Sequence, residues 1–191
     1  MSAIHEHVLQ NGMTLLCWPQ RHLHGLEFGL YLKGGPLYET EETQGISNLL
    51  EHLCFRGLGG LNREGLLREL NRFGTNLDAA TYAEGLVFRL KCLPRFFDAA
   101  LEYFLRFFAN VPWTPEQIAA EKQVVLRQLE ADGDGDLFDR AACDFRKTEN
   151  GAFPPLGTPE SLMALTEADI QLWQEMIFQP QNACLVMTGN F

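Results

Sequence analysis

The sequence predicts an α+β fold: a mixed, largely antiparallel sheet of about five or six strands packed against several helices. Two observations lead to this prediction. Short segments with alternating apolar residues are typical of strands, and longer segments with apolar residues three and four apart are typical of helices. Strand and helix segments alternate along the chain without a repeat or a low-complexity linker. We therefore expect residues 1–191 to form a single domain.

Strand patterns occur in four parts of the chain, at residues 6–17, 26–32, 75–92 and 183–189. The first contains Asn11-Gly12, a strong turn signal, and therefore predicts two short strands joined by a hairpin. The third also predicts two strands, with a turn at 82–85. The last is short and almost wholly apolar, which is typical of a buried strand.

Helix patterns fill most of the remaining chain, at residues 45–55, 62–73, 94–108, 114–131 and 160–178. The first has Ile46, Leu49, Leu50 and Leu53 at helical spacing, which predicts one buried side. Thr-Pro-Glu at 114–116 is a typical helix start. The segment 160–178 predicts one or two helices.

The composition excludes several classes of protein. The net charge of −10, without a cluster of Lys and Arg, is unfavourable for nucleic-acid binding. No uninterrupted apolar segment reaches the length of about 18 residues that a membrane span needs. The first residues lack the basic and apolar regions of a secretory signal. We therefore expect a cytoplasmic protein that binds neither nucleic acid nor membrane.

The strongest chemical signal is GISNLLEHLCFRG at residues 45–57. On a helix, Asn48 and His52 lie one turn apart, and Glu51 lies on the same side. Zinc peptidases with the inverted H-x-x-E-H motif place two histidine ligands at this spacing, and the glutamate acts as the base. Here the pattern is N-x-x-E-H, which on its own also fits the polar edge of an amphipathic helix.

Several segments in the same order resemble the pitrilysin/insulinase family of zinc peptidases, which includes the mitochondrial processing peptidases. The resemblance covers nearly the whole chain. Its segments are LQNGMTLLC, YLKGGPLYETEETQGISNLLEHLCFRG, FGTNLDAATYAEGLVFRL, EKQVVLRQLE and LGTPESLMALTEADIQLWQEMIFQPQNACLVMTGNF. The resemblance implies the metallopeptidase half-domain fold of that family, with this chain as the first of two similar halves.

The resemblance also implies a zinc site made of two histidines and a distal glutamate, with Glu51 at the position of the base. The corresponding ligand positions hold Asn48, His52 and Gln128, the last being seven residues after Glu121. Neutral amides bind zinc poorly compared with imidazole or carboxylate. We therefore expect zinc to be absent or weakly held, Glu51 to be idle and the chain to be catalytically inactive. Glu121 is the residue best placed to rescue a shifted site.

The family binds peptides by adding them as a strand to a sheet edge near the motif, which here implies Asp78, Ala79, Ala80 and Thr81. Glu84 also matches the family pattern and is expected to support the site. We therefore expect a peptide or an unfolded polypeptide as ligand, and a second pitrilysin-like domain or subunit as partner. The alternatives are an active zinc endopeptidase with altered ligands and a purely structural module.

Overall fold

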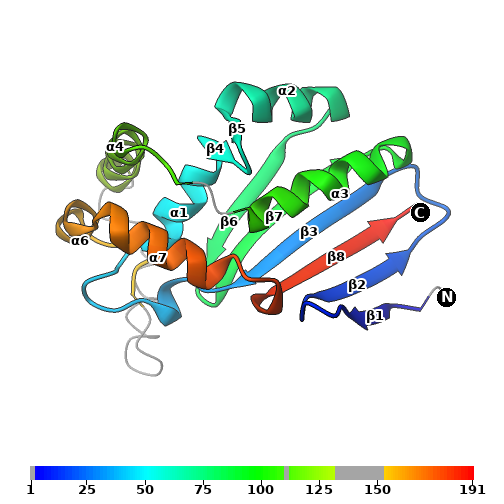
Figure 1. The fold of residues 1–191 in the computed structure, drawn as a ribbon, viewed down its shortest axis with the longest axis horizontal. Helices are drawn as coiled ribbons and strands as arrows, with labels where there is room; N and C mark the ends of the chain where they lie inside the picture. The colour runs from blue at the N-terminus through cyan, green and yellow to red at the C-terminus, as the bar shows by residue number, and fades with distance from the viewer. Residues whose placement is uncertain (1–2, 110–111, 132–152) are drawn as a thin grey trace.

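The computed structural model describes residues 3–109, 112–131 and 153–191. Its main sheet is six-stranded, in the order β1-β2-β8-β3-β7-β6 (Figure 1). The strands are β1 His5–Val8, β2 Thr14–Pro19, β3 Leu26–Lys33, β6 Leu77–Tyr82, β7 Gly85–Cys92 and β8 Ala183–Gly189. Strands β2 and β8 pair in parallel and the other neighbours pair antiparallel, which confirms the predicted mixed, largely antiparallel sheet.

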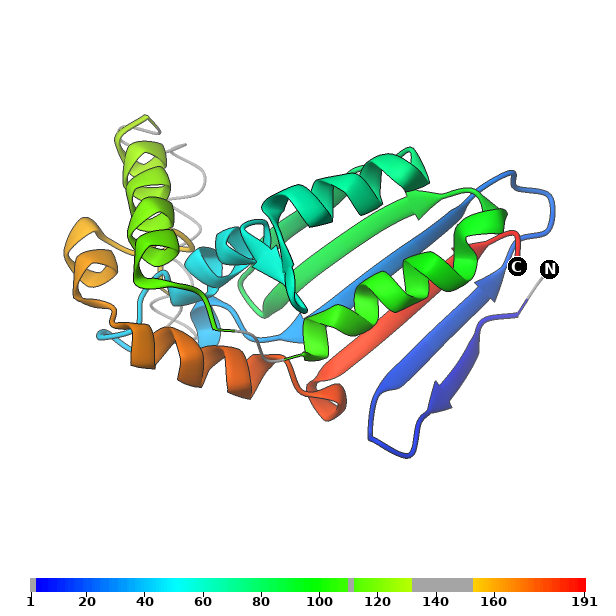
Figure 2. The ribbon, with the colours of Figure 1, turned by 45° about the horizontal axis from the view of Figure 1, so that its top comes forward.

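The α-helices are α1 Ile46–Cys54, α2 Arg63–Phe73, α3 Phe97–Leu105, α4 Pro115–Ala131, α6 Pro159–Ala164 and α7 Glu167–Ile177. Helices α2 and α3 lie along one face of the sheet, whereas α1, α4, α6 and α7 gather at one end of it (Figures 1 and 2). Among the described helices, none has the length and apolar character needed to cross a membrane.

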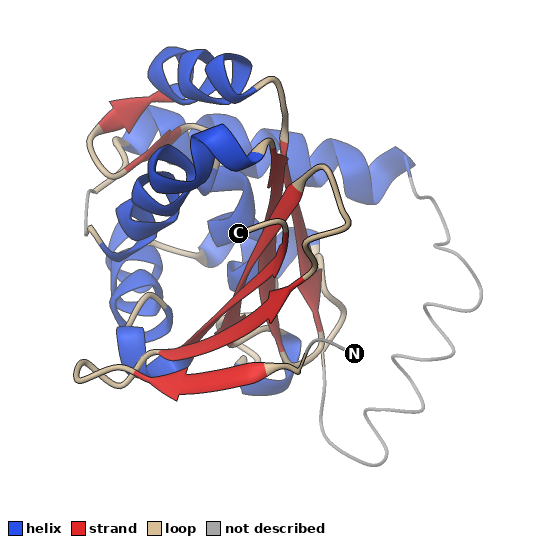
Figure 3. Cartoon of the chain, turned by 90° about the vertical axis from the view of Figure 1, so that its right-hand side faces the viewer, coloured by secondary structure: helices blue, strands red, loops and turns tan. Residues whose placement is uncertain are grey.

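The core lies between the sheet and the helices, which Figure 3 shows mostly on one side of the strands. On β3, the alternate residues Phe28 and Leu30 are fully buried, whereas Tyr31 is 45% exposed on the opposite face. Aromatic rings from α3 and the following turn pack on this buried face, with the centroids of Phe28 and Phe104 5.8 Å apart. One side of the sheet is therefore dry, and the other presents exposed side chains.

Two details differ from the sequence prediction, and one open choice is decided. The segment 94–108, predicted as one helix, is divided into a 3-10 turn at Pro94–Phe96, helix α3 and a second 3-10 turn at Arg106–Phe108. Such tighter turns are frequent at helix ends, and Pro94 starts the first of them. The segment 160–178, for which one or two helices were predicted, forms two, each with its own capping box, at Thr158 and at Thr166.

The second difference is a small hairpin after the motif helix, which the sequence prediction missed. Strands β4 Gly57–Leu58 and β5 Leu61–Asn62 pair through Gly59 and Gly60, both with positive φ. Glycine tolerates this backbone conformation, which explains the pair of glycines at the turn.

Candidate functional site

Helix α1 carries the predicted motif, and a carboxylate from the preceding loop holds its first turn. The Glu39 carboxylate accepts hydrogen bonds from the backbone N–H groups of Gly45 at 2.8 Å and Ser47 at 3.0 Å. An acidic group is favourable here because the first amides of a helix point outward without partners. Burial raises the pKa of Glu39, and its hydrogen bonds with Ser47 and Gly45 offset part of the rise.

The remaining contacts of α1 fix its orientation. Trp173 of α7 donates its indole N–H to the Ser47 hydroxyl at 3.1 Å, and both residues are buried. The predicted apolar side, Ile46, Leu49, Leu50 and Leu53, is fully buried. Helix α1 also packs against α4 and β6, so its polar side chains lie among these elements.

Toward α4, His52 meets a buried carboxylate. His52 Nδ1 lies 3.3 Å from Glu121 Oε2, and Arg56 Nε donates to the other oxygen of the same carboxylate. The Glu121 side chain is only 7% exposed. The arginine therefore supplies the positive charge that a buried carboxylate needs. The result is a group of three contacting side chains, including the Arg56–Glu121 ion pair, that joins α1 to α4.

Toward β6, Glu51 accepts a hydrogen bond of 2.5 Å from the Thr81 hydroxyl. Burial raises the pKa of Glu51, whereas the Thr81 hydroxyl and the neighbouring His52 lower it in part. No lysine or arginine among the described residues forms a salt bridge with Glu51. Glu51 is thus a half-buried carboxyl group that accepts a hydrogen bond from a neutral hydroxyl.

The two substituted ligand positions differ in their surroundings. The Asn48 side-chain oxygen is buried and has no hydrogen-bond partner among the described residues. Gln128 is exposed on α4, about two turns beyond Glu121. Glu121, not Gln128, is therefore the α4 side chain that contacts His52.

This set of donors does not fit a zinc ion. Protein zinc sites use imidazole, thiolate and carboxylate ligands, usually four in a tetrahedron. Within the described ranges, no three His, Cys, Asp or Glu side chains come together in a way that could hold a metal. The amides of Asn48 and Gln128 suit hard cations instead. Glu121 does approach His52, but its charge is already neutralised by Arg56.

The four residues predicted as a peptide-binding edge lie together on β6. This strand pairs with β7 and is the outer strand of the main sheet. Thr81 and Ala79 pair with the buried Leu86 and Phe88 of β7, so their side chains share the face that α1 covers. Asp78 and Ala80 therefore point to the opposite face.

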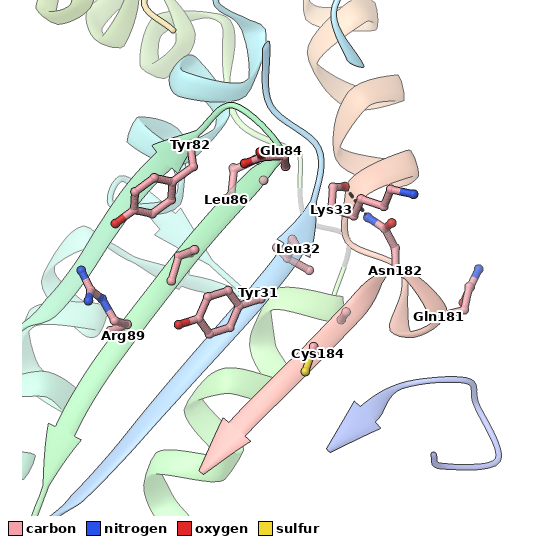
Figure 4. A pocket seen from close by; sticks show the side chains of 13 residues that line it. Tyr31, Leu32, Lys33, Tyr82, Glu84, Leu86, Arg89, Gln181, Asn182 and Cys184 are labelled. Atoms are coloured by element: carbon pink, nitrogen blue, oxygen red, sulfur yellow. Dashed lines mark hydrogen bonds between the residues drawn. The ribbon is translucent and has the colours of Figure 1, made fainter. Parts of the chain in front are cut away.

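Glu84 lies apart from the motif helix. It is exposed in the turn between β6 and β7 and lines a hollow on the open face of the sheet (Figure 4). Tyr31, Tyr82 and Arg89 project into the same hollow. Alternation along β3 and β7 could have predicted which side chains share this face, but not that they surround a hollow.

Comparison with known proteins decides the family. A sequence profile of the insulinase family, peptidase family M16, matches residues 24–142. The chain belongs to the M16 family. The predicted resemblance is thereby confirmed, as is the metallopeptidase-like character that goes with it.

Relatives of this M16 chain include enzymes named for zinc. An uncharacterized zinc protease from Rickettsia felis is 26% identical over 185 residues, which is 95% of this chain and 45% of that protein. The mitochondrial-processing peptidase subunit beta of Caenorhabditis elegans is 27% identical over 165 residues, 85% of this chain and 36% of that one. The M16 chain thus spans less than half the length of these relatives.

Solved structures share the fold. A protease from Helicobacter pylori superimposes with a TM-score of 0.90 at 22% identity, covering 100% of this chain and 47% of that one. A peptidase M16 inactive domain from Pseudomonas fluorescens superimposes with a TM-score of 0.85 at 15% identity, covering 99% of this chain and 47% of the other. This chain corresponds to one half of these longer proteins.

Sequence reasoning missed two residues that shape the M16 site. Glu39 holds the start of α1 from six residues before Gly45, a separation too long for a local capping pattern. Arg56 lies just beyond the motif, and only the packing of α4 on α1 brings it to Glu121. The acidic loop before the helix and the basic residue after it were the available signals.

Proposed function

We propose that this chain is a non-catalytic M16 domain that binds an extended peptide as an additional strand on β6. The observation that carries the proposal is the contact of His52 with Glu121, whose charge Arg56 neutralises. His52, the histidine that the motif retains, thus contacts a carboxylate that already forms an ion pair with Arg56. Neighbouring Asn48 can offer only an amide.

The loss of ligands explains why peptide cleavage is not proposed. The family chemistry needs a metal ion that polarises a water molecule, and a carboxylate to remove its proton. Replacing two of the ligands by amides is a larger change than altering a residue behind a ligand, which typically costs about 10- to 100-fold in affinity or activity. Glu51 is retained, but it has no metal-bound water to activate.

Strand addition needs no metal. An outer strand has backbone N–H and C=O groups on one side that are not used within its own sheet. A peptide can pair with these groups, and its alternate side chains then contact the two faces of the sheet. Strand β6 is suited to this role because it is an outer strand directly beside the motif helix.

A second domain is part of the same proposal. The solved relatives are about twice as long as this chain, which matches 47% of the Helicobacter pylori protease. We propose that residues 1–191 form one domain and that a second M16-like domain, in the same or another chain, completes the binding chamber. The inactive M16 domain from Pseudomonas fluorescens is likewise about twice as long as this chain and shares its fold.

Hydrogen–deuterium exchange on the full chain tests the proposal. The probe is a synthetic, unstructured peptide rich in Lys, Val and Thr. Binding should slow exchange of the backbone amides of β6, Leu77–Tyr82, and leave those of β1, His5–Val8, unchanged. Strand β1 is the matched control because it is the opposite outer strand of the sheet.

The same peptide should remain intact when zinc is added to the mixture. A copy with methylated backbone nitrogens, which cannot donate to a strand, should bind much more weakly. Zinc-dependent cleavage of the peptide would favour the active peptidase. An absence of binding to either copy would favour the purely structural module.

A further inference from the structure

The two carboxylates at the motif helix differ in whether a positively charged side chain pairs with them. Glu121 has the guanidinium of Arg56 and the ring of His52 against it. Glu51 has the Thr81 hydroxyl, which carries no charge. A half-buried carboxylate is costly to keep ionised unless a cation or several donors compensate it. When it is ionised, Glu51 therefore carries a negative charge that forms no salt bridge with a lysine or arginine among the described residues, and the neighbouring His52 offsets it only in part.

An unpaired acceptor lies on the same side of the helix. The buried Asn48 oxygen has no hydrogen-bond partner among the described residues. Asn48 precedes Glu51 by three residues, so their side chains lie on one side of α1. Buried acceptors without partners are rare in folded proteins, and a bound ligand, water or ion is one of the explanations for them. Two acceptors, one of them charged, thus lie where a positively charged donor would satisfy both.

The geometry of strand pairing shows how a peptide brings such a donor close to Glu51. Thr81 is on the face of β6 that α1 covers, and its hydroxyl already reaches Glu51. On a strand added next to β6, the residue opposite Thr81 points to this same face, with its Cβ about 5 Å from that of Thr81. A long side chain at that position reaches the surroundings of Glu51.

We propose that Glu51 and Asn48 bind the ammonium or guanidinium group of a lysine or arginine in the added peptide. This inference rests on the proposed function, because the peptide strand on β6 delivers the basic side chain. The site then selects extended peptides that carry a basic residue on the face toward α1. The net charge of −10 favours the approach of such peptides.

The ligand chemistry favours a basic side chain over a metal ion. A lysine ammonium has three donors and a single charge, which matches one carboxylate and one amide oxygen. Zinc would need further imidazole, thiolate or carboxylate ligands, and the described side chains offer no group of three. A neutral side chain would leave the charge of Glu51 uncompensated.

A peptide series measures the effect directly. The host is an unstructured Val- and Thr-rich peptide in which one lysine is placed at each position in turn. A matched peptide carries norleucine at that position, which keeps the carbon chain and removes the charge. Binding to the full chain is measured by fluorescence anisotropy. At one position, lysine should bind about tenfold more tightly than norleucine, as expected for a charged hydrogen bond.

Variants assign the effect to the site. Glu51→Gln should remove the preference for lysine, and Asn48→Leu should reduce it. Glu64→Gln is the matched control, because Glu64 is an exposed glutamate in the first turn of α2. This variant should keep the full preference. Backbone methylation of the peptide should weaken binding to all of these proteins.

The outcomes separate the inference from the proposed function. If methylation weakens binding but lysine and norleucine bind equally at every position, strand addition stands and the cation site is wrong. If the preference for lysine persists in Glu51→Gln, the cation site is also wrong. If neither peptide binds to the wild-type chain, both proposals fail.

Discussion

The carboxylates on the two sides of helix α1 have different partners. On the side toward α4, Glu121 is buried and paired with Arg56 and His52. On the side toward β6, Glu51 is half-buried and accepts a hydrogen bond from the Thr81 hydroxyl. On the α4 side an arginine compensates the charge of the carboxylate. On the β6 side no lysine or arginine among the described residues does so.

This difference teaches that one side of α1 is held by an ion pair and the other by a hydrogen bond to a neutral hydroxyl. Toward α4, Arg56 supplies the positive charge beside Glu121, and this ion pair joins the two helices. No lysine or arginine among the described residues forms a salt bridge with Glu51. The β6 side is therefore where a ligand would make the larger difference.

Removing the buried carboxylate on the α4 side should have the largest effect. Glu121→Ala leaves Arg56 without its partner, and breaking a buried ion pair typically costs about 3–5 kcal/mol. Because Arg56 is itself 29% exposed, we expect the lower part of this range in urea unfolding. The control Glu130→Ala, at an exposed position of the same helix, should change stability by less than about 0.5 kcal/mol. Equal losses in the two variants would show that the α4 side is not held by this ion pair.

Removing the hydroxyl on the β6 side should have a smaller effect. Thr81→Val keeps the shape of the side chain and deletes the donor to Glu51. A hydrogen bond to a charged group contributes about 1.5–3 kcal/mol, and partial exposure places the expected loss near the lower end. Thr81→Ser retains the hydroxyl and should recover most of the stability. If valine and serine behave alike in urea unfolding, the contact of Glu51 with Thr81 does not stabilise this side.

The pH dependence of stability should show the smallest effect and reports on Glu51 alone. Its pKa is raised above the usual value of 4.5, chiefly by burial. The folded chain therefore holds this proton more tightly than the unfolded chain, and the resulting stabilisation is complete at low pH. It is lost as the pH rises through the folded pKa.

The variant Glu51→Gln stays neutral at every pH and lacks this loss. Unfolding free energies of the two proteins should therefore diverge above about pH 4.5 in favour of the variant. Glu39 also has a raised pKa, but it is present in both proteins and cancels in the difference. A constant difference across this range would mean that Glu51 is not desolvated.

Much of the fold could be predicted from the sequence because its signals are local. The Asn11-Gly12 turn joins β1 and β2, and the apolar spacing of residues 45–55 forms α1 as expected. The aromatic segment 94–108 was misjudged as a single helix because 3-10 turns at helix ends leave little trace in apolar spacing. Local patterns thus predict which element forms better than where it ends.

The candidate site was only partly predictable because it is assembled by packing. Asn48, Glu51 and His52 share one side of a helix, and that follows from spacing alone. The choice between Glu121 and Gln128 on α4 could not be made in this way, since it depends on how α4 lies against α1. The pairing of Arg56 with Glu121 spans 65 residues and has no local signal.

The zinc content of the full chain tests the central claim most directly. The wild-type protein is dialysed against zinc, passed over a desalting column and measured by inductively coupled plasma mass spectrometry. Asn48→His combined with Gln128→Glu is the comparison variant, because it restores both ligand types. We expect far less than one zinc per wild-type chain and a clear gain in the double variant. One tightly held zinc per wild-type chain, lost on His52→Ala, would contradict the account.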